Sequence, residues 1–141
     1  MSSISFFNED IDFKLSNQRK TRDWITKVVK REGYTLIHIN YIFCSEEYLH
    51  GINIDHLSHD TYTDIITFDQ SDNAQDIEAD IYISVDRVRE NAKSFKFTFD
   101  HELRRVMIHG VLHLMVYSDK TPEETEVMRK REDSSLSLYF V

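Results

Sequence analysis

The order of apolar and polar segments predicts an α+β fold: a small mixed sheet of about four strands with helices packed against it. Short runs of β-branched and aromatic residues alternate irregularly with segments of helical periodicity. A stretch at residues 106–115 is apolar on nearly every side and predicts a buried helix. The chain has 141 residues, 40% of them hydrophobic, so residues 1–141 are expected to form a single domain with a real core.

Each element can be assigned from local signals. Strands are expected at residues 4–7, 34–44, 64–68 and 80–84, where β-forming side chains gather. Helices are expected at 17–31, from Ser45 through Ile52, from Ser84 through Ala92, from a cap at Asp100, and from Pro122 toward the C-terminus. Gly33 ends the first helix. Residues 55–63 and 69–79 are expected to be polar loops.

Two histidines one helical turn apart are the most informative feature of the chain. They stand in His109-Gly-Val-Leu-His113, and positions i and i+4 share one helix face with an offset of about 40°. Both imidazoles can therefore reach one metal ion. A histidine pair of this kind is more often packed or solvated than metal-bound. Here the surrounding segment is apolar, and burying two histidines is costly unless their nitrogens have partners.

Asp119 can complete the set only if the chain folds back after the helix. Residues 121–124 read Thr-Pro-Glu-Glu, which combines an N-cap residue, proline at the first helical position and glutamate three residues after the cap. A new helix is therefore expected near Pro122, with a turn at residues 116–121. His109, His113 and Asp119 then form a three-ligand site with an open position, as in catalytic zinc centres, and one Zn²⁺ per chain is expected.

Bulk composition favours a cytoplasmic protein with no membrane association. No apolar run approaches the roughly 20 residues needed to cross a bilayer, and the N-terminus lacks the features of a secretion signal. Cys44 is the single cysteine, which excludes an intramolecular disulfide; it is expected to be a buried strand residue. The net charge of −8 weighs against a nucleic-acid partner, although residues 19–31 carry a cluster of Lys and Arg.

Three segments together resemble the YbeY family of bacterial endoribonucleases and rRNA maturation factors. They are His109-Gly-Val-Leu-His113-Leu, Thr63-Asp-Ile-Ile-Thr-Phe68 and Asp80-Ile-Tyr-Ile-Ser84, and they follow the family's order over nearly the whole chain. The resemblance implies a zinc-binding domain, with a metalloprotease-like zinc helix, that cuts single-stranded RNA. It also implies a role in maturation of the small-subunit rRNA 3′ end and in ribosome quality control, with the ribosome as partner.

The chain departs from the family pattern at three positions. Asp119 stands where the family commonly has a third histidine, and the charge of a carboxylate makes zinc a weaker Lewis acid. Val116 replaces the usual glycine of the turn, and Leu57 stands where many members have an arginine. If that arginine meets phosphate, Leu57 lowers activity or leaves the task to another cation.

Candidate roles follow from position along the chain. His109 and His113 are the expected catalytic metal ligands, and Arg105, one turn earlier, is the candidate for phosphate or transition-state charge. Pairing of Arg105 with Glu102 or Asp100 is the equally simple alternative for its charge. Further residues of possible use are a strand-start carboxylate, a loop histidine and an aromatic ring for base stacking, namely Asp64, His59 and Tyr117.

Two other functions stay open from the sequence. Metzincin-type proteases share the ligand spacing, but their general base is a glutamate directly after the first histidine. Gly110 occupies that position here, and glycine cannot accept a proton, which disfavours a metalloprotease. A non-catalytic ribosome assembly factor stabilised by zinc is the other alternative, favoured by Leu57 and the acidic balance. The oligomeric state cannot be derived from the sequence.

Overall fold

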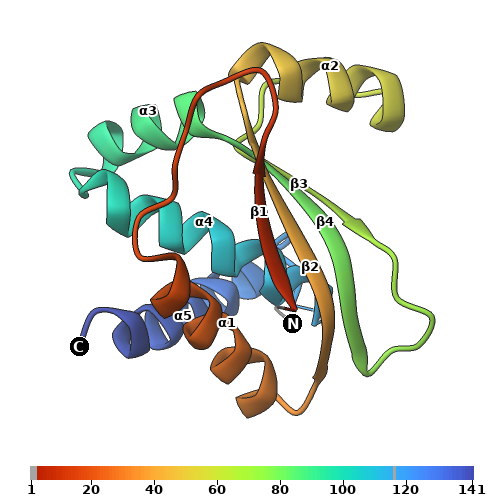
Figure 1. Ribbon diagram of the computed structural model, residues 1–141, viewed down its shortest axis with the longest axis vertical. Coiled ribbons are helices and arrows are strands. Elements are labelled where there is room, and N and C mark those ends of the chain that lie inside the picture. Colours follow the sequence, from red (N-terminus) through yellow and green to blue (C-terminus); the bar gives the residue numbers. More distant parts are fainter. Residues whose placement is uncertain (1–2, 116) are drawn as a thin grey trace.

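The computed structural model describes residues 3–115 and 117–141 and confirms the expected α+β architecture (Figure 1). In chain order the elements are β1 (Ile4–Asn8), α1 (Gln18–Arg31), β2 (Thr35–Cys44), α2 (Glu46–Leu57), β3 (Ile65–Asp69), β4 (Asp76–Ser84), α3 (Val85–Phe95), α4 (Phe99–Leu114) and α5 (Pro122–Tyr139).

The four strands form one mixed sheet in the order β1-β2-β4-β3. β1 and β2 run parallel, as do β2 and β4, whereas β3 pairs antiparallel with β4 at the edge of the sheet. β2 and β4 are the central strands, and their inward side chains are almost completely buried. The mixed sheet of about four strands that the sequence predicts is therefore present.

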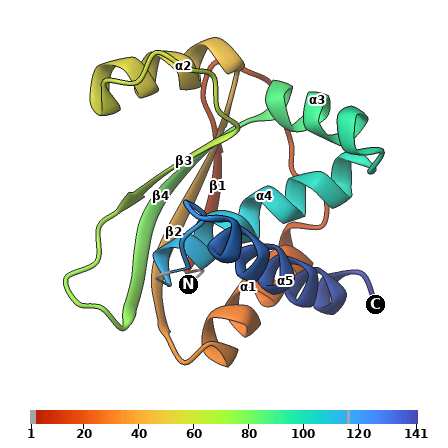
Figure 2. The same cartoon turned by 180° about the vertical axis from the view of Figure 1, so that it is seen from behind.

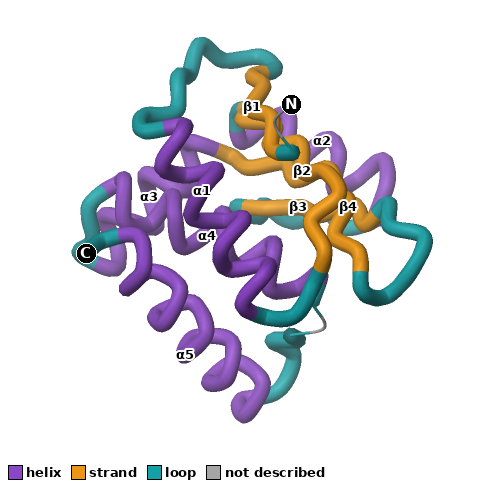
Figure 3. The backbone as a smooth tube through the Cα atoms, turned by 60° about the horizontal axis from the view of Figure 1, so that its bottom comes forward, coloured by secondary structure: helices purple, strands orange, loops and turns teal. Residues whose placement is uncertain are grey.

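Helices cover the two faces of the sheet unequally. α1, α3, α4 and α5 gather on one face, where they share the main hydrophobic core with all four strands (Figures 1 and 2). α2 lies on the opposite face (Figure 3), over a small cluster that contains Cys44, Leu49 and Ile66. No helix in the described part of the chain has the length and apolarity required to cross a bilayer.

α4 is the buried helix that the apolar segment predicts. Its residues from Leu103 through Ile108 are buried, as are Val111 and Leu112. Gly110 lets this helix approach the sheet closely, because a Cβ at this position would lie 2.8 Å from Ile65 Cδ1 and 3.1 Å from Thr67 Cγ2. The absence of a side chain at one helical position therefore sets the distance between the histidine pair and the edge strand.

The structure corrects several expected boundaries. α4 is capped by the Thr98 hydroxyl, which accepts a hydrogen bond from the His101 backbone, so Asp100 lies in the first turn and is not the cap. α2 continues through Leu57 into the expected loop at 55–63. It ends at Ser58, whose backbone adopts the left-handed conformation that residue type alone does not predict for serine. β4 begins at Asp76, within the expected loop at 69–79, where pairing with β2 extends it.

Candidate metal centre

α4 and the turn that follows it bring three metal-binding side chains together. His109 and His113 lie one turn apart on α4, and the chain then leaves the helix and returns before α5 begins. Thr121 and Glu124 form the expected capping box, in which each side chain bonds the backbone N–H of the other residue. The Thr125 hydroxyl donates to the backbone carbonyl of Asp119. The start of α5 therefore holds Asp119 against α4.

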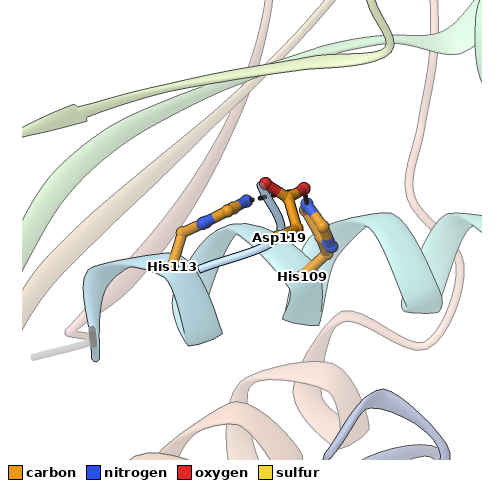
Figure 4. Close-up of side chains that lie close together, drawn as sticks. All are labelled: His109, His113 and Asp119. Carbon is orange, nitrogen blue, oxygen red and sulfur yellow. Dashed lines mark ion pairs between the residues drawn. The ribbon is translucent and has the colours of Figure 1, made fainter. Parts of the chain in front are cut away.

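The two imidazoles converge on the carboxylate of Asp119 (Figure 4). Asp119 Oδ2 lies 3.6 Å from His109 Nε2 and 3.4 Å from His113 Nε2. One donor atom from each of the three residues lies within 4.8 Å of the other two, so the group could hold a metal ion. Two imidazole nitrogens and one carboxylate oxygen form a donor set that suits zinc.

A fourth residue, Glu132 on α5, contacts the ring nitrogen of His109 that faces away from Asp119. Its Oε2 lies 2.6 Å from His109 Nδ1, and Glu132 is only 4% exposed. Burial opposes charge on both groups, but their mutual hydrogen bond and charges outweigh it: the pKa of His109 is raised and the pKa of Glu132 is lowered. The hydrogen bond between the two side chains therefore favours the charged form of each.

The sequence interpretation missed Glu132, although a signal for it exists. The residue stands in the highly charged segment Arg129-Lys-Arg-Glu-Asp133, which resembles a solvated helix surface. Met128 and Leu136, however, lie four residues to either side and are both buried. Spacing by four places Glu132 on that inner face, where a lone carboxylate needs a partner.

Arg105 does not lie free in the site. It is 7% exposed and donates to Glu132 Oε1 at 2.7 Å and to Asp133 Oδ1 at 3.4 Å. Its Nε is also 3.6 Å from Glu102 Oε1. The alternative of pairing with Glu102 is thus present, whereas Asp100 pairs with Arg104 instead. The positive charge of Arg105 is already balanced by neighbouring carboxylates.

Two cavities meet at His109, and Asp64 and Asp119 also line both of them, whereas His113 lines only one. One, of about 360 Å³, lies between α3, α4 and α5 and includes Arg105 and Arg129. The other, of about 500 Å³, follows the edge strand β3 and the end of α2. Asp64 lies at their junction, as expected of a residue near the site. Burial raises the pKa of its carboxyl group more than the nearby His109 lowers it.

The remaining expected site residues separate into two groups. His59 and Leu57 line the cavity along β3, and Leu57, 41% exposed, presents an apolar side chain there. Tyr117 packs against the main core, and its hydroxyl donates to Glu32 Oε1 at 2.9 Å, so the ring contributes to packing. The expectation for Val116, a turn without glycine, lies outside the described residues.

Two further sequence features lie away from the site. Cys44 is buried in β2 as expected, and burial raises the pKa of its thiol to about 12, which keeps the group unreactive. The basic residues of α1 do not approach the histidine pair. Arg19, Lys20 and Lys27 instead line a cavity between α1 and α5, together with Trp24 and Tyr139.

The whole length of this arrangement matches a known family. A family model described as "Endoribonuclease YbeY" covers residues 3–139. The chain belongs to the endoribonuclease YbeY family. A relative named "Endoribonuclease YbeY" from Cytophaga hutchinsonii is 51% identical over 96% of this chain and 95% of its own length. Another of that name from Christiangramia forsetii is 48% identical over 98% of this chain and 95% of its own length.

A solved structure has a similar fold. The solution structure of a Thermotoga maritima protein superposes with a TM-score of 0.64 at 28% identity, covering 96% of this chain and 91% of the other. The YbeY relatives and this structural neighbour therefore match the chain over nearly its whole length.

Proposed function

We propose that this protein is a zinc-dependent endoribonuclease that cuts single-stranded RNA during maturation of the small-subunit rRNA 3′ end and in ribosome quality control. The proposal places it in the cytoplasm, with the ribosome as partner. One observation carries it: His109, His113 and Asp119 converge in a member of a family whose model is described as an endoribonuclease. Membership of that family supplies RNA as the substrate.

The donor set is suited to a catalytic metal. His109, His113 and Asp119 would be the three protein ligands, which leaves a position open for water or substrate. Zinc bound there would supply Lewis-acid polarisation of a phosphate oxygen and activation of water. The side chains of His109 and His113 are part-exposed, and both adjoin the cavity along β3. A substrate phosphate can therefore reach the site from this side.

Asp64 and Arg129 are our candidates for contact with substrate. Asp64 lies at the junction of the two cavities and would orient the attacking water or a ribose hydroxyl. Arg129 lines the cavity on the α5 side, and its side chain is 52% exposed with a single ion pair, at 4.0 Å to Glu132, in the described part of the chain. Its freer guanidinium suits phosphate better than that of the enclosed Arg105, and it would replace the cation that Leu57 does not provide.

The geometry around Gly110 argues against a metalloprotease. A Cβ at this position would lie 2.8 Å from Ile65 Cδ1 and 3.1 Å from Thr67 Cγ2, so the glutamate that serves as general base in HExxH proteases would have to displace side chains of β3. Glu102, the buried carboxyl of the same helix, lies two turns earlier, about 10 Å along the axis. Neither position supplies a base next to the first histidine.

The test is an RNA cleavage assay on ribosomal precursor and on an unstructured protein, with and without chelator. The parent protein should cut single-stranded RNA, lose this activity with chelator and leave the protein substrate intact. His113→Ala should lose both zinc and cleavage, because one of three ligands is gone. His38→Ala is the matched control, since His38 bonds Asn40 on the sheet. Equal zinc content in His113→Ala and the parent would refute the ligand assignment.

A non-catalytic, zinc-stabilised assembly factor is the second candidate, favoured by Leu57 in the cavity and the net charge of −8. It predicts co-sedimentation with the small ribosomal subunit and a lower melting temperature after zinc removal, without RNA cleavage by the intact protein. Chelator-sensitive cleavage by the parent would exclude this candidate.

A further inference from the structure

Glu132 lies between a candidate metal ligand and a buried arginine, and each of its oxygens has its own donor. Oε2 is 2.6 Å from His109 Nδ1, and Oε1 is 2.7 Å from Arg105 Nη1. Both residues belong to α4, whereas Glu132 comes from α5. Both oxygens of the Glu132 carboxylate are therefore held, and Glu132 links α5 to α4 beside His109.

This contact determines which nitrogen of His109 is available to a metal. A carboxylate facing Nδ1 requires the hydrogen on that nitrogen, so Nε2 is the atom that can present a lone pair. Nε2 is also the atom that faces Asp119 Oδ2. Metal-binding histidines commonly donate their second N–H to a carboxylate, which fixes the orientation of the ring and raises its basicity as a ligand.

Arg105 holds the carboxylate in place. A buried carboxylate without a cation is costly, and Arg105 supplies that cation to Glu132. Its Nη1 donates to Glu132 and its Nη2 to Asp133, whereas its Nε lies 3.6 Å from Glu102 Oε1 without a hydrogen bond. A guanidinium held by Glu132 and Asp133 has little freedom to turn toward a substrate. Arg105 therefore acts on the site through Glu132.

The two histidines are held differently. Among residues 3–115 and 117–141, the only ion-pair partner of His113 is Asp119, the candidate ligand itself. Its ring also meets that of His109 edge to face, with centroids 4.5 Å apart. Loss of Glu132 should therefore change the orientation of the His109 ring. The position of His113 is set by α4 and should stay unchanged.

We propose that Glu132, held by Arg105, is a positioning residue that presents His109 Nε2 to the metal. The inference rests on the proposed function only in taking His109, His113 and Asp119 as zinc ligands. It assigns Arg105 a role in ligand orientation in place of direct contact with phosphate.

Three variants test this proposal: Glu132→Ala, Glu132→Gln and the control Glu126→Gln. Glutamine keeps an oxygen that can accept the His109 N–H but lacks the charge. Glu126 lies on the same helix, exposed, and pairs only with Lys130 in the described structure. For each protein, the zinc dissociation constant is measured by competition with a chromophoric chelator. The visible spectrum of the cobalt form and the NMR signal of the His109 Nδ1–H in the zinc form are also recorded.

Glu132→Ala should bind zinc about 10- to 100-fold more weakly, the range typical for loss of such a partner. Its cobalt spectrum should change, and the His109 Nδ1–H signal should be lost to exchange with water. Glu132→Gln should recover part of the affinity and keep the proton signal, while Glu126→Gln stays within about twofold of the parent. RNA cleavage is assayed in parallel.

Three results would overturn the proposal: parental zinc affinity in Glu132→Ala, an unchanged Nδ1–H signal in that variant, or no zinc binding by the parent. Affinity losses that only follow the stability of the metal-free variants in urea would also count against it, since they indicate a purely structural role. A parent that binds zinc but cuts no RNA would refute the proposed function while leaving the positioning role standing.

Discussion

Glu102 provides a test of the electrostatics beside the site, through the variant Glu102→Gln. The residue is 2% exposed, and burial raises the pKa of its carboxyl group from 4.5 to about 7, although Arg105 opposes the shift. Between these two values the folded protein keeps a proton that the unfolded chain has lost. Stability contributed by this group is therefore complete below pH 4.5 and falls as the pH rises toward about 7.

The size of the effect follows from the separation of the two pKa values. A rise in the pKa from 4.5 to about 7 corresponds to roughly 3 kcal/mol, at 1.36 kcal/mol for each pH unit, and most of this is lost between pH 5 and pH 8. Glutamine does not titrate, so the free energy of unfolding of Glu102→Gln should rise relative to the parent by about this amount over that range. Urea denaturation of both chelator-treated proteins at pH 5, 6, 7 and 8 measures the difference. A difference that is constant with pH would refute the reasoning.

Three further substitutions test the framework of the site. Gly110→Glu should lower the free energy of unfolding by about 3 kcal/mol or more in urea, because it forces a charged side chain against Ile65; parental stability would show that α4 has room there. Thr121→Ala should lower the free energy of unfolding by about 1 kcal/mol through loss of the capping box, and it should weaken zinc binding. An unchanged melting temperature by calorimetry together with an unchanged zinc titration would contradict this. Tyr117→Phe loses the hydrogen bond to Glu32 and should lower the free energy of unfolding by about 1 kcal/mol. Its RNA affinity, measured by fluorescence anisotropy, should stay unchanged, and weaker binding would indicate that the hydroxyl contacts RNA.

The convergence of His109, His113 and Asp119 could be predicted because its signals are local. The helical spacing of the histidines and the Thr-Pro-Glu-Glu start of α5 together require the chain to turn back between them. The three candidate ligands lie within a segment of eleven residues, 109–119, so no long-range packing had to be known. The strands and the buried helix were equally accessible, because their side-chain periodicities are strong.

Contacts between distant segments could not be obtained in the same way. Glu132 is 23 positions from His109 and 27 from Arg105 in the sequence. Its pairing with them depends on how α5 packs against α4. The order of the strands likewise reflects tertiary packing. The extra turns of α2 end at Ser58, a non-glycine residue with positive φ, which residue preferences alone would not select.

The short span of the candidate ligands has a consequence for metal exchange. An ion bound by residues 109, 113 and 119 closes a loop of about ten residues, and so small a loop constrains the unfolded chain only modestly. The main core lies among the strands and the four helices on their inner face and is complete without the ion. We therefore expect a metal ion bound at this site to leave and return while the fold persists, so that metal supply would control the proposed activity without unfolding the protein.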